Sequence, residues 1–301
     1  MLSPRGRCLV APRRGARIRD WDLPCSSVPR ASATLTVWAS AWLHGSAAPD
    51  DVIDALHAWA ELHEVVAADA GAARLLDQET TSVVGLLGSL RRAGAEGGRL
   101  LLPVPGDVRG LPPEGTLTRA ALSAGEVTLL GDGGTGPAAT LRPREQVPVL
   151  AVVPAPVAEG VLRWTVFAPV TAPPVEEPLL SEAEHGLRGA VRQAATALVD
   201  LDVARHRPGV RAEIAETLGR RVRPPWPQGS PGRALRVLEQ ADEVEAILRA
   251  AEGDEPGAAL SASAATARSS ALRPLFTAVR EARRSAVGEA VRVLTPGAGR
   301  C

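Results

Sequence analysis

Apolar residues recur at helical spacing through the first part of the chain. Leu35, Trp38 and Trp42 lie three and four positions apart, and Gly45 ends the run, which predicts an amphipathic helix. A second predicted helix begins at Pro49 and continues to about residue 70, with another over residues 79–93. The apolar face of the second helix is formed by Val52, Leu56, Trp59, His63 and Val66. Three consecutive helices predict a small helical layer.

The hydrophobic period shortens after residue 98. Short apolar runs bounded by Gly and Pro are typical of strands, and a short helix is expected over residues 117–124. The segment 131–134 is rich in Gly and predicts a hairpin turn. Short turns between strands favour an antiparallel sheet. The strand candidates are residues 100–104, 127–130, 138–142, 149–153 and 161–170.

Helical periodicity returns after the Pro-rich segment 169–178. Ser181 and Glu184 have the spacing of a capping box, which predicts a helix start at this position. Pro274 is expected to kink or divide the last helical region. The helical runs extend to about residue 208 and over 211–218, 232–251 and 258–294. Helices of this kind form a bundle or an antiparallel stack.

The pattern as a whole predicts an α+β fold. N-terminal helices pack on a small antiparallel sheet, and a C-terminal helical bundle follows. Residues 1–30 are expected to form a disordered basic tail, and residues 31–172 an α+β lobe of three helices and about five strands. A Pro-rich linker is expected over 173–181, a helical lobe over 182–296 and a short tail over 297–301.

The composition removes several kinds of chemistry. Apolar residues make up 45% of the chain, which is typical of a globular protein. The chain has no Lys, Tyr or Asn, and all 34 basic residues are Arg. A phosphate-binding Walker lysine and a Schiff-base cofactor are therefore excluded. We expect no cofactor, and a high-GC genome accounts for the residue bias.

Charge and cysteine content limit the partners and the compartment. Residues 1–30 carry seven Arg against two acids, whereas residues 31–172 carry nine Arg against fifteen acids. An acidic central region argues against nucleic acid as a partner. No apolar run reaches the roughly 18 residues of a membrane span. The three cysteines lie in the predicted tails, at Cys8, Cys25 and Cys301, so we expect a reducing compartment and a cytoplasmic location.

The loop from Pro105 to Pro113 is a candidate binding site. It follows a strand and presents Asp107 and Arg109 among Gly and Pro residues. Binding residues often lie on loops held at a strand end, and an arginine there could pair with a carboxylate or phosphate. The alternative is a tight connection in which Asp107 caps its own turn.

His57 and Glu61 form a candidate metal site. They lie four residues apart on one predicted helix, and imidazole and carboxylate groups both bind divalent metals. His63 is six residues from His57, so on a helix the two rings point to different faces. We therefore expect no metal site, with a solvated polar face and a half-buried His63 as the structural interpretation.

Tryptophans supply a last candidate. Trp38, Trp42 and Trp59 are expected to hold the first two helices together. Trp226 lies in a rigid Pro-rich loop, where it either fills a gap between bundle and sheet or acts as an exposed anchor for a protein partner.

Three segments carry a resemblance to known sequences: residues 38–43 (WASAWL), 101–107 (LLPVPGD) and 201–205 (LDVAR). With them the chain resembles an uncharacterised protein family of high-GC, actinobacterial-type bacteria. The resemblance implies lineage and no known activity.

Sequence alone leaves three hypotheses for the function. The first is a non-enzymatic cytoplasmic binding or scaffold protein with a protein partner or small ligand, because no catalytic constellation is complete. The second is a metal-binding protein or hydrolase-like enzyme in which residues 50–64 face the 105–113 loop. The third is a protein that senses a small ligand between its two lobes, suggested by the Pro-rich linker and Trp226.

Overall fold

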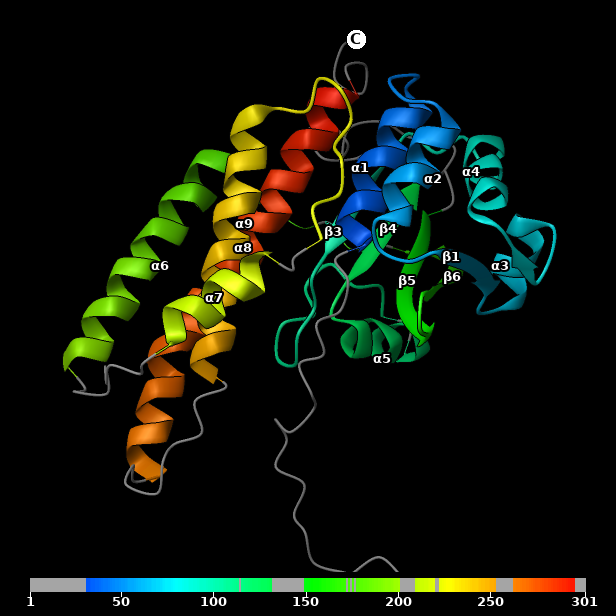
Figure 1. The fold of residues 1–301 in the computed structure, drawn as a ribbon. Helices are drawn as coiled ribbons and strands as arrows, with labels where there is room; N and C mark the ends of the chain where they lie inside the picture. The colour runs from blue at the N-terminus through cyan, green and yellow to red at the C-terminus, as the bar shows by residue number, and fades with distance from the viewer. Residues whose placement is uncertain are drawn as a thin grey trace, which may run out of the picture.

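A computed structural model of the 301-residue chain describes residues 31–113, 115–131, 149–171, 173, 175, 177–200, 209–219, 222–252 and 262–295. Within these ranges the chain is an α+β protein with helices on both faces and beside one edge of a six-stranded sheet (Figure 1). The predicted fold class is therefore confirmed. In the described part of the chain, no helix combines the length and the apolarity needed to cross a bilayer.

The sheet is mixed, whereas the sequence predicted an antiparallel one. Its strand order is β2-β1-β6-β5-β4-β3, and β1 pairs with β6 in parallel while the other neighbours are antiparallel. The chain between β1 and β6 is long enough for a parallel pairing, which needs a crossover of a dozen or more residues. The strands are β1 (Leu62–Ala67), β2 (Thr80–Thr81), β3 (Gly97–Leu101), β4 (Val127–Gly131), β5 (Val149–Ala158) and β6 (Val161–Val170).

The described residues of the N-terminal part form five helices: α1 (Ala31–Leu43), α2 (Pro49–His57), α3 (Ala70–Leu76), α4 (Val83–Arg92) and α5 (Gly115–Ala124). A first core joins α1–α4 to one face of the sheet through Leu130, Val152 and Trp164. A separate core joins α5 to the other face through Leu129 and Val153. Alternate residues of β4 and β5 thus serve opposite faces, as strand geometry requires.

The predicted helix over residues 49–70 is wrong. The helix ends at His57, and residues 62–67 form β1 before α3 begins. Trp59, His63 and Val66 happen to continue the helical spacing of Val52 and Leu56. A short strand with few buried positions cannot be distinguished from a helix by period alone. Pairing with β6 on one side and with β2 on the other makes this segment extended.

Four helices form the C-terminal part: α6 (Leu180–Asp200), α7 (Val210–Gly219), α8 (Gly232–Glu252) and α9 (Ala262–Leu294). Pro274 lies inside α9 and does not divide it, so of the two predicted outcomes, a kink or a division, the division is wrong. Leu272, Leu275 and Val279 are buried on either side of the proline, so packing offsets the lost hydrogen bond. The predicted capping box is also shifted: Glu182 accepts the Leu179 N–H at 3.1 Å, while Glu184 pairs with Arg188 and Arg233.

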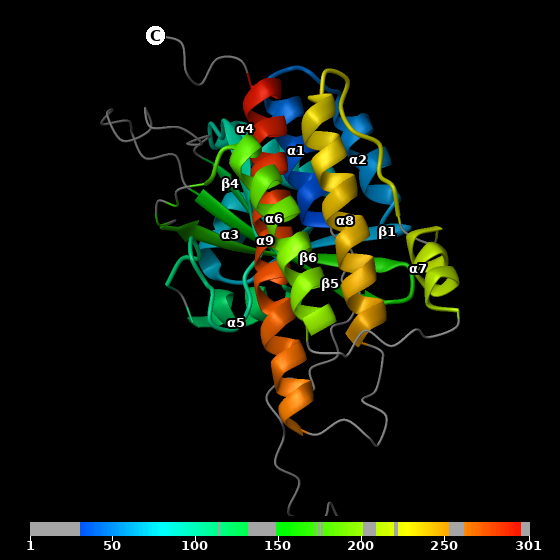
Figure 2. The ribbon, with the colours of Figure 1, turned by 90° about the vertical axis from the view of Figure 1, so that its left-hand side faces the viewer.

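A second core connects the C-terminal helices with the rest of the molecule. It combines the apolar faces of α6, α8 and α9 with Val37 and Ala41 of α1 and with Leu100 of β3. Helix α9 therefore lies beside α1 and the β3 edge of the sheet, and α6 and α8 pack on α9; the long helices run across the strands (Figures 1 and 2). Helix α1 is buried between the two cores.

Several buried hydroxyls on α1 have hydrogen-bond partners, although that of Ser32 has none among the described residues. The Thr36 hydroxyl donates to the Ser32 carbonyl at 2.7 Å and lies 3.1 Å from the Thr128 hydroxyl of β4. The Trp59 indole donates to Thr34 Oγ1 at 2.8 Å, which ties the segment after α2 to α1. These bonds offset the cost of burying hydroxyls in a helix that is enclosed on all sides.

Some predicted features lie outside the described residues. They are the strand over 138–142, the turn residues 132–134, the tails 1–30 and 297–301, and the three cysteines.

Gly98 lies on β3 at a position where α1 and β4 leave little room for a side chain. A Cβ atom at Gly98 would lie 2.8 Å from Leu130 Cδ2 and 3.3 Å from Thr36 Cγ2. We predict that Gly98→Ala lowers the free energy of unfolding by about 1–3 kcal/mol through overpacking. Gly186→Ala is the control, because nothing lies within 4 Å of its Cβ. This helical substitution should stabilise by about 0.5–1 kcal/mol. Urea unfolding measures both, and equal effects of the two variants would contradict the prediction.

Candidate functional site

A cavity of about 60 Å³ lies where α1, β3, α8, α9 and the segment after α7 meet. A water molecule needs only roughly 10–15 Å³ of cavity space, so several waters or a small organic group would fit. The polar groups on its wall are Thr34, Glu126, Asp242 and Arg283. The aromatic and apolar part of the wall is formed by Trp59, Trp226, Leu100, Leu102, Leu238, Val222, Pro224, Val287 and Ala33.

Trp226 is one wall of this cavity. Its side chain is half-buried and packs against the second core. The Trp38 indole donates to the Pro225 carbonyl at 2.9 Å, which holds the Pro-rich segment against α1. The structure therefore places Trp226 between the C-terminal helices and the α1 side of the molecule. Its role as a partner anchor stays a prediction.

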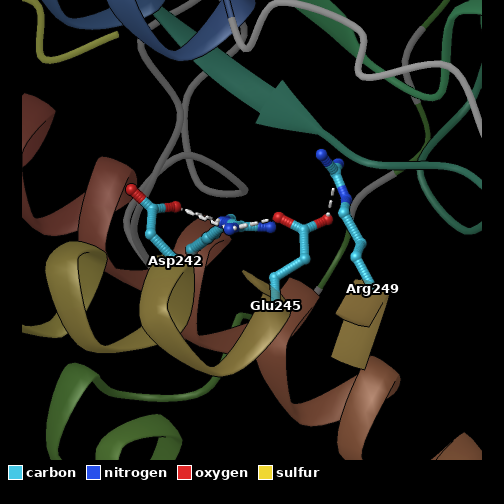
Figure 3. Close-up of polar contacts among 4 residues, drawn as sticks. Asp242, Glu245 and Arg249 are labelled. Atoms are coloured by element: carbon cyan, nitrogen blue, oxygen red, sulfur yellow. Dashed lines mark hydrogen bonds and ion pairs between the residues drawn. The ribbon is translucent and has the colours of Figure 1, made fainter. Parts of the chain in front are cut away.

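Arg283 of α9 is a buried cation beside the cavity. Its side chain is 7% exposed and donates to Asp242 Oδ1 through Nε at 3.1 Å and through NH2 at 2.6 Å. The same NH2 group also donates to Glu245 Oε2 at 2.6 Å. Figure 3 shows the carboxylates of Asp242 and Glu245 directed at one guanidinium, with Arg249 beyond Glu245. Burial lowers the pKa of Arg283, and Asp242 opposes this shift.

Glu126 is the second acid on the cavity wall. It lies just before β4, is 3% exposed and accepts the Ser32 N–H at 3.3 Å in the first turn of α1. A carboxylate at a helix N-terminus is stabilised by the helix dipole. Glu126 also raises the pKa of Arg283 by electrostatic attraction. The cavity wall thus carries two carboxylates and one guanidinium.

The sequence analysis did not identify Glu126, Asp242 and Arg283 as site residues. One signal was present for Arg283, because it lies four residues after Val279 and four before Val287, both of which are core residues. A charge inside an apolar helical stripe indicates a buried ion pair or a site. Glu126 gave no such signal, because its place at the start of α1 depends on packing between distant segments.

The predicted Asp107 and Arg109 are brought together, but they bind each other. The Asp107 carboxylate accepts Arg109 Nε at 2.8 Å and Arg109 NH2 at 3.0 Å. Arg280 of α9 lies 3.5 Å from the same carboxylate. Hydrogen bonding from Arg109 lowers the pKa of Asp107 to about 2. This loop is therefore tied to α9 by an ion pair, and Arg109 already has a carboxylate partner.

A third arginine of α9 lies beside a buried acid. Burial raises the pKa of Glu177, whereas the charges of Arg284 and Arg99 oppose that shift. Glu177 Oε1 and Arg284 Nε are buried and make no hydrogen bond within the described residues. Gly288 leaves room for this carboxylate, since a Cβ there would lie 2.8 Å from Glu177 Oε2.

The metal hypothesis is not supported by the geometry of its residues. His57 ends α2 and Glu61 lies beyond the helix, so the two do not share a helical face as predicted. The His57 and His63 rings are 5.9 Å apart, but both nitrogens of His63 already have partners. His63 Nε2 lies 3.0 Å from the Leu56 carbonyl, and Nδ1 accepts the Trp164 indole N–H at 3.1 Å. Among the described residues, no group of three or more His, Cys, Asp or Glu is placed to hold a metal ion.

The segments 50–64 and 105–113 do not form a common catalytic site. Asp107 and Arg109 follow β3 and bind each other and α9. His63 lies on β1, which is separated from β3 by three strands of the sheet. At about 4.8 Å per strand, these two strands are about 19 Å apart.

A larger surface depression of about 600 Å³ lies between α6 and α9. Gly186, Gly189 and Ala190 line it on the α6 side, and His185, Arg273 and Glu281 lie around it. Its charges are of both signs and face solvent.

The fold and the cavity define an α+β protein with a small, charged, tryptophan-lined cavity beside its central helix. The chain belongs to the Rv1486c-like protein family: the family's N-terminal domain matches residues 32–178 and its C-terminal domain residues 181–284. The predicted resemblance to an uncharacterised actinobacterial family is confirmed.

Relatives of the chain occur in mycobacteria. The uncharacterized protein Rv1486c of Mycobacterium tuberculosis (strain ATCC 25618 / H37Rv) is 40% identical over 283 residues, covering 85% of this chain and 95% of that protein. The uncharacterized protein ML1804 of Mycobacterium leprae (strain TN) is 33% identical over 298 residues with the same coverage. No solved structure matches the chain significantly.

His63 should make folding sensitive to acid. Burial lowers its pKa below 6.5. The unfolded chain therefore takes up a proton more readily than the folded one, and stability is lost as the pH falls from 6.5 through the folded pKa. We predict that His63→Gln flattens the dependence of the free energy of unfolding on pH between 7.5 and 5. His185→Gln, at an exposed histidine, should leave the wild-type slope unchanged. An unchanged slope in His63→Gln would contradict the assignment.

Arg283 should be far more important for stability than a surface arginine of the same helix. We predict that Arg283→Met costs about 3–5 kcal/mol, because Asp242 and Glu245 then remain partly buried without this cation. Arg292→Met is the matched control, since its pair with Glu289 is 61% exposed on the arginine side. A change of less than about 1 kcal/mol is expected there. Denaturant unfolding of both variants tests the difference, and similar losses would refute it.

Proposed function

We propose that this protein is a non-enzymatic binding protein that holds a small ligand in the cavity between Trp59 and Trp226. The observation that carries the proposal is the combination of apolar, aromatic and buried charged groups around one hollow. Ligand sites are typically apolar cavities with a few polar groups that fix orientation. The central cavity has this composition, whereas the other candidate residues are engaged in structural contacts.

The proposal includes two lobes, residues 31–172 and 182–296, that meet at the cavity. The separate family matches to 32–178 and 181–284 support a division close to this boundary. Ala33 and Thr34 reach the cavity from the first lobe, and Leu238 and Val287 from the second. Domain interfaces are frequent places for ligands. A ligand held here would contact both lobes, as expected for a sensor.

The polar groups on the cavity wall are already hydrogen-bonded to other parts of the protein, which favours binding without catalysis. Asp242 and Arg283 are engaged with each other, and Glu126 is bonded to the start of α1. The described residues that line the cavity include no His, Cys or Ser, and its carboxylates and the Thr34 hydroxyl, which could otherwise act as bases or nucleophile, take part in structural hydrogen bonds. A cytoplasmic location belongs to this proposal and is supported by the cysteine content.

The second candidate function is that of a scaffold protein, which would bind a protein partner in place of a small ligand. The depression between α6 and α9 is larger than the cavity and is open to solvent. In that case the partner would contact the exposed part of the half-buried Trp226 side chain.

Trp226 provides the test of the proposed function. We predict that small amines, alcohols or carboxylates from a screening set raise the melting temperature of the wild-type protein. Trp226→Leu should abolish this shift for those same compounds, because the variant loses one cavity wall.

The matched control is Trp164→Phe, at a buried indole on the sheet that does not line the cavity. It should lower the melting temperature and keep the ligand-induced shift. Compounds that stabilise the Trp226→Leu variant as much as the wild type would place the binding site elsewhere.

A further inference from the structure

We propose that residues 222–227 form a lid over the cavity, which the hydrogen bond from the Trp38 indole to the Pro225 carbonyl holds closed. This proposal rests on the proposed function, because the lid would control the entry of a ligand to that same cavity. Three features of the segment support it: alternate residues line the cavity, few hydrogen bonds hold the segment in place, and prolines make it stiff.

The lid segment presents one side to the cavity and the other to solvent. It runs beside α1 on its way from α7 to α8 (Figure 1). Val222, Pro224 and Trp226 line the cavity, whereas the intervening Arg223 and Pro225 are exposed. Alternate side chains of an extended chain point to opposite sides, so this pattern is the one expected for an extended cover. Moving this single segment outward would open the cavity to solvent.

Few hydrogen bonds hold the lid to the rest of the molecule. Three of its six residues are prolines, which have no N–H group to donate. Among the described residues, the only hydrogen bond between the lid and another element is the one that Trp38 Nε1 donates to the Pro225 carbonyl at 2.9 Å. The Ser230 N–H also bonds to the Pro227 carbonyl, but this bond lies within the turn that leads to α8. A segment held by so few bonds opens at a lower free-energy cost than the core does.

The closed position of the lid is nevertheless well defined. Trp226 packs against the second core, and Pro227 is buried. The Trp38 side chain is 7% exposed on the buried helix α1, so its indole donor has a fixed place. The Trp38 bond and the packing of Trp226 are therefore the two contacts that opening has to break.

The composition of the lid favours movement as one unit. Proline rings fix the backbone angle φ, so residues 224–227 form a stiff piece of chain. A glycine lies toward each end: Gly219 ends α7, and Gly229 has a φ of +87° in the turn before α8. Hinges consist of a few loop or element-terminal residues that absorb the change in backbone angles, and glycine does this without steric cost.

Thiol labelling measures the opening of the lid without any ligand. Cys8, Cys25 and Cys301 are first replaced by serine, so that each variant has a single engineered thiol. Val287→Cys places it on the cavity wall, and Val153→Cys places it in the core between α5 and the sheet. The two valines are 1% and 3% exposed, and a bulky aromatic disulfide reagent does not fit a cavity of about 60 Å³. We expect the thiol at position 287 to react at least tenfold faster, because it needs only the lid to open.

Trp38→Phe tests the bond that holds the lid closed. The variant keeps an aromatic ring on α1 and removes the indole donor. We expect the ratio of the two labelling rates, position 287 over position 153, to rise about three- to tenfold, as for the loss of one hydrogen bond. The ratio cancels any loss of global stability, because global unfolding exposes both thiols.

The matched control is Trp42→Phe, at a second buried tryptophan of α1 that makes no hydrogen bond to the described lid residues. It should leave the ratio unchanged. If Trp38→Phe fails to fold, Trp226→Leu replaces it and should also raise the ratio, because the lid then loses its largest apolar contact.

Two results would overturn the lid: equal labelling rates of the two thiols, or a ratio that is the same in Trp38→Phe and Trp42→Phe. Neither result bears on whether the cavity binds a ligand. The melting-temperature shift and its loss in Trp226→Leu decide the proposed function separately. A compound that produces this shift should also lower the labelling ratio, because it fills the cavity beneath the lid.

Discussion

Complete burial of α1 is the constraint from which the rest of the structure follows. Eleven of its 13 residues are buried, because the sheet and α2 cover one side while α9 and the second core cover the other. In a helix enclosed in this way, each hydroxyl or N-terminal N–H group that lacks a partner costs free energy. Thr128, Trp59 and Glu126 meet part of that need from three distant segments. The candidate cavity lies at this same end of α1.

Three arginines of α9 connect the C-terminal helices to other parts of the fold. Arg280 reaches Asp107 after β3, Arg283 reaches Asp242 and Glu245 of α8, and Arg284 lies beside Glu177. Buried ion pairs add little net stability compared with apolar side chains of similar size. These pairs instead fix how the helices pack, because each pair forms in only one relative position of the two elements that it joins. Arg283 and Asp242 also line the cavity, so the packing of α9 on α8 and the proposed recognition of a ligand involve the same ion pair.

Predictions from the spacing of apolar residues succeeded where a long apolar stripe lay within a single helix or strand. The helices near residues 31–43 and 232–252 and the strand at 161–170 were predicted because long apolar stripes identify them. The segment around His63 failed, since its residues continue a helical spacing while pairing with β6 makes them extended. Pairing between residues about one hundred positions apart leaves no local trace. On α8, Asp242 was missed because its contact with Arg283 depends on helix packing, whereas Arg283 itself was overlooked although its place between Val279 and Val287 was a local signal.

By itself, the sequence determined the α+β class, the helical C-terminal region, the absence of lysine chemistry and the family resemblance, since composition and local period carry these properties. Tertiary structure alone decided the mixed sheet, the pairing of Asp107 with Arg109, and the meeting of Glu126 with Arg283. The physical reason is that burial and charge neutralisation are properties of neighbours in space. Glu126 and Asp242 are 116 positions apart in the chain, and only the packing of α1 between two cores brings them to one cavity.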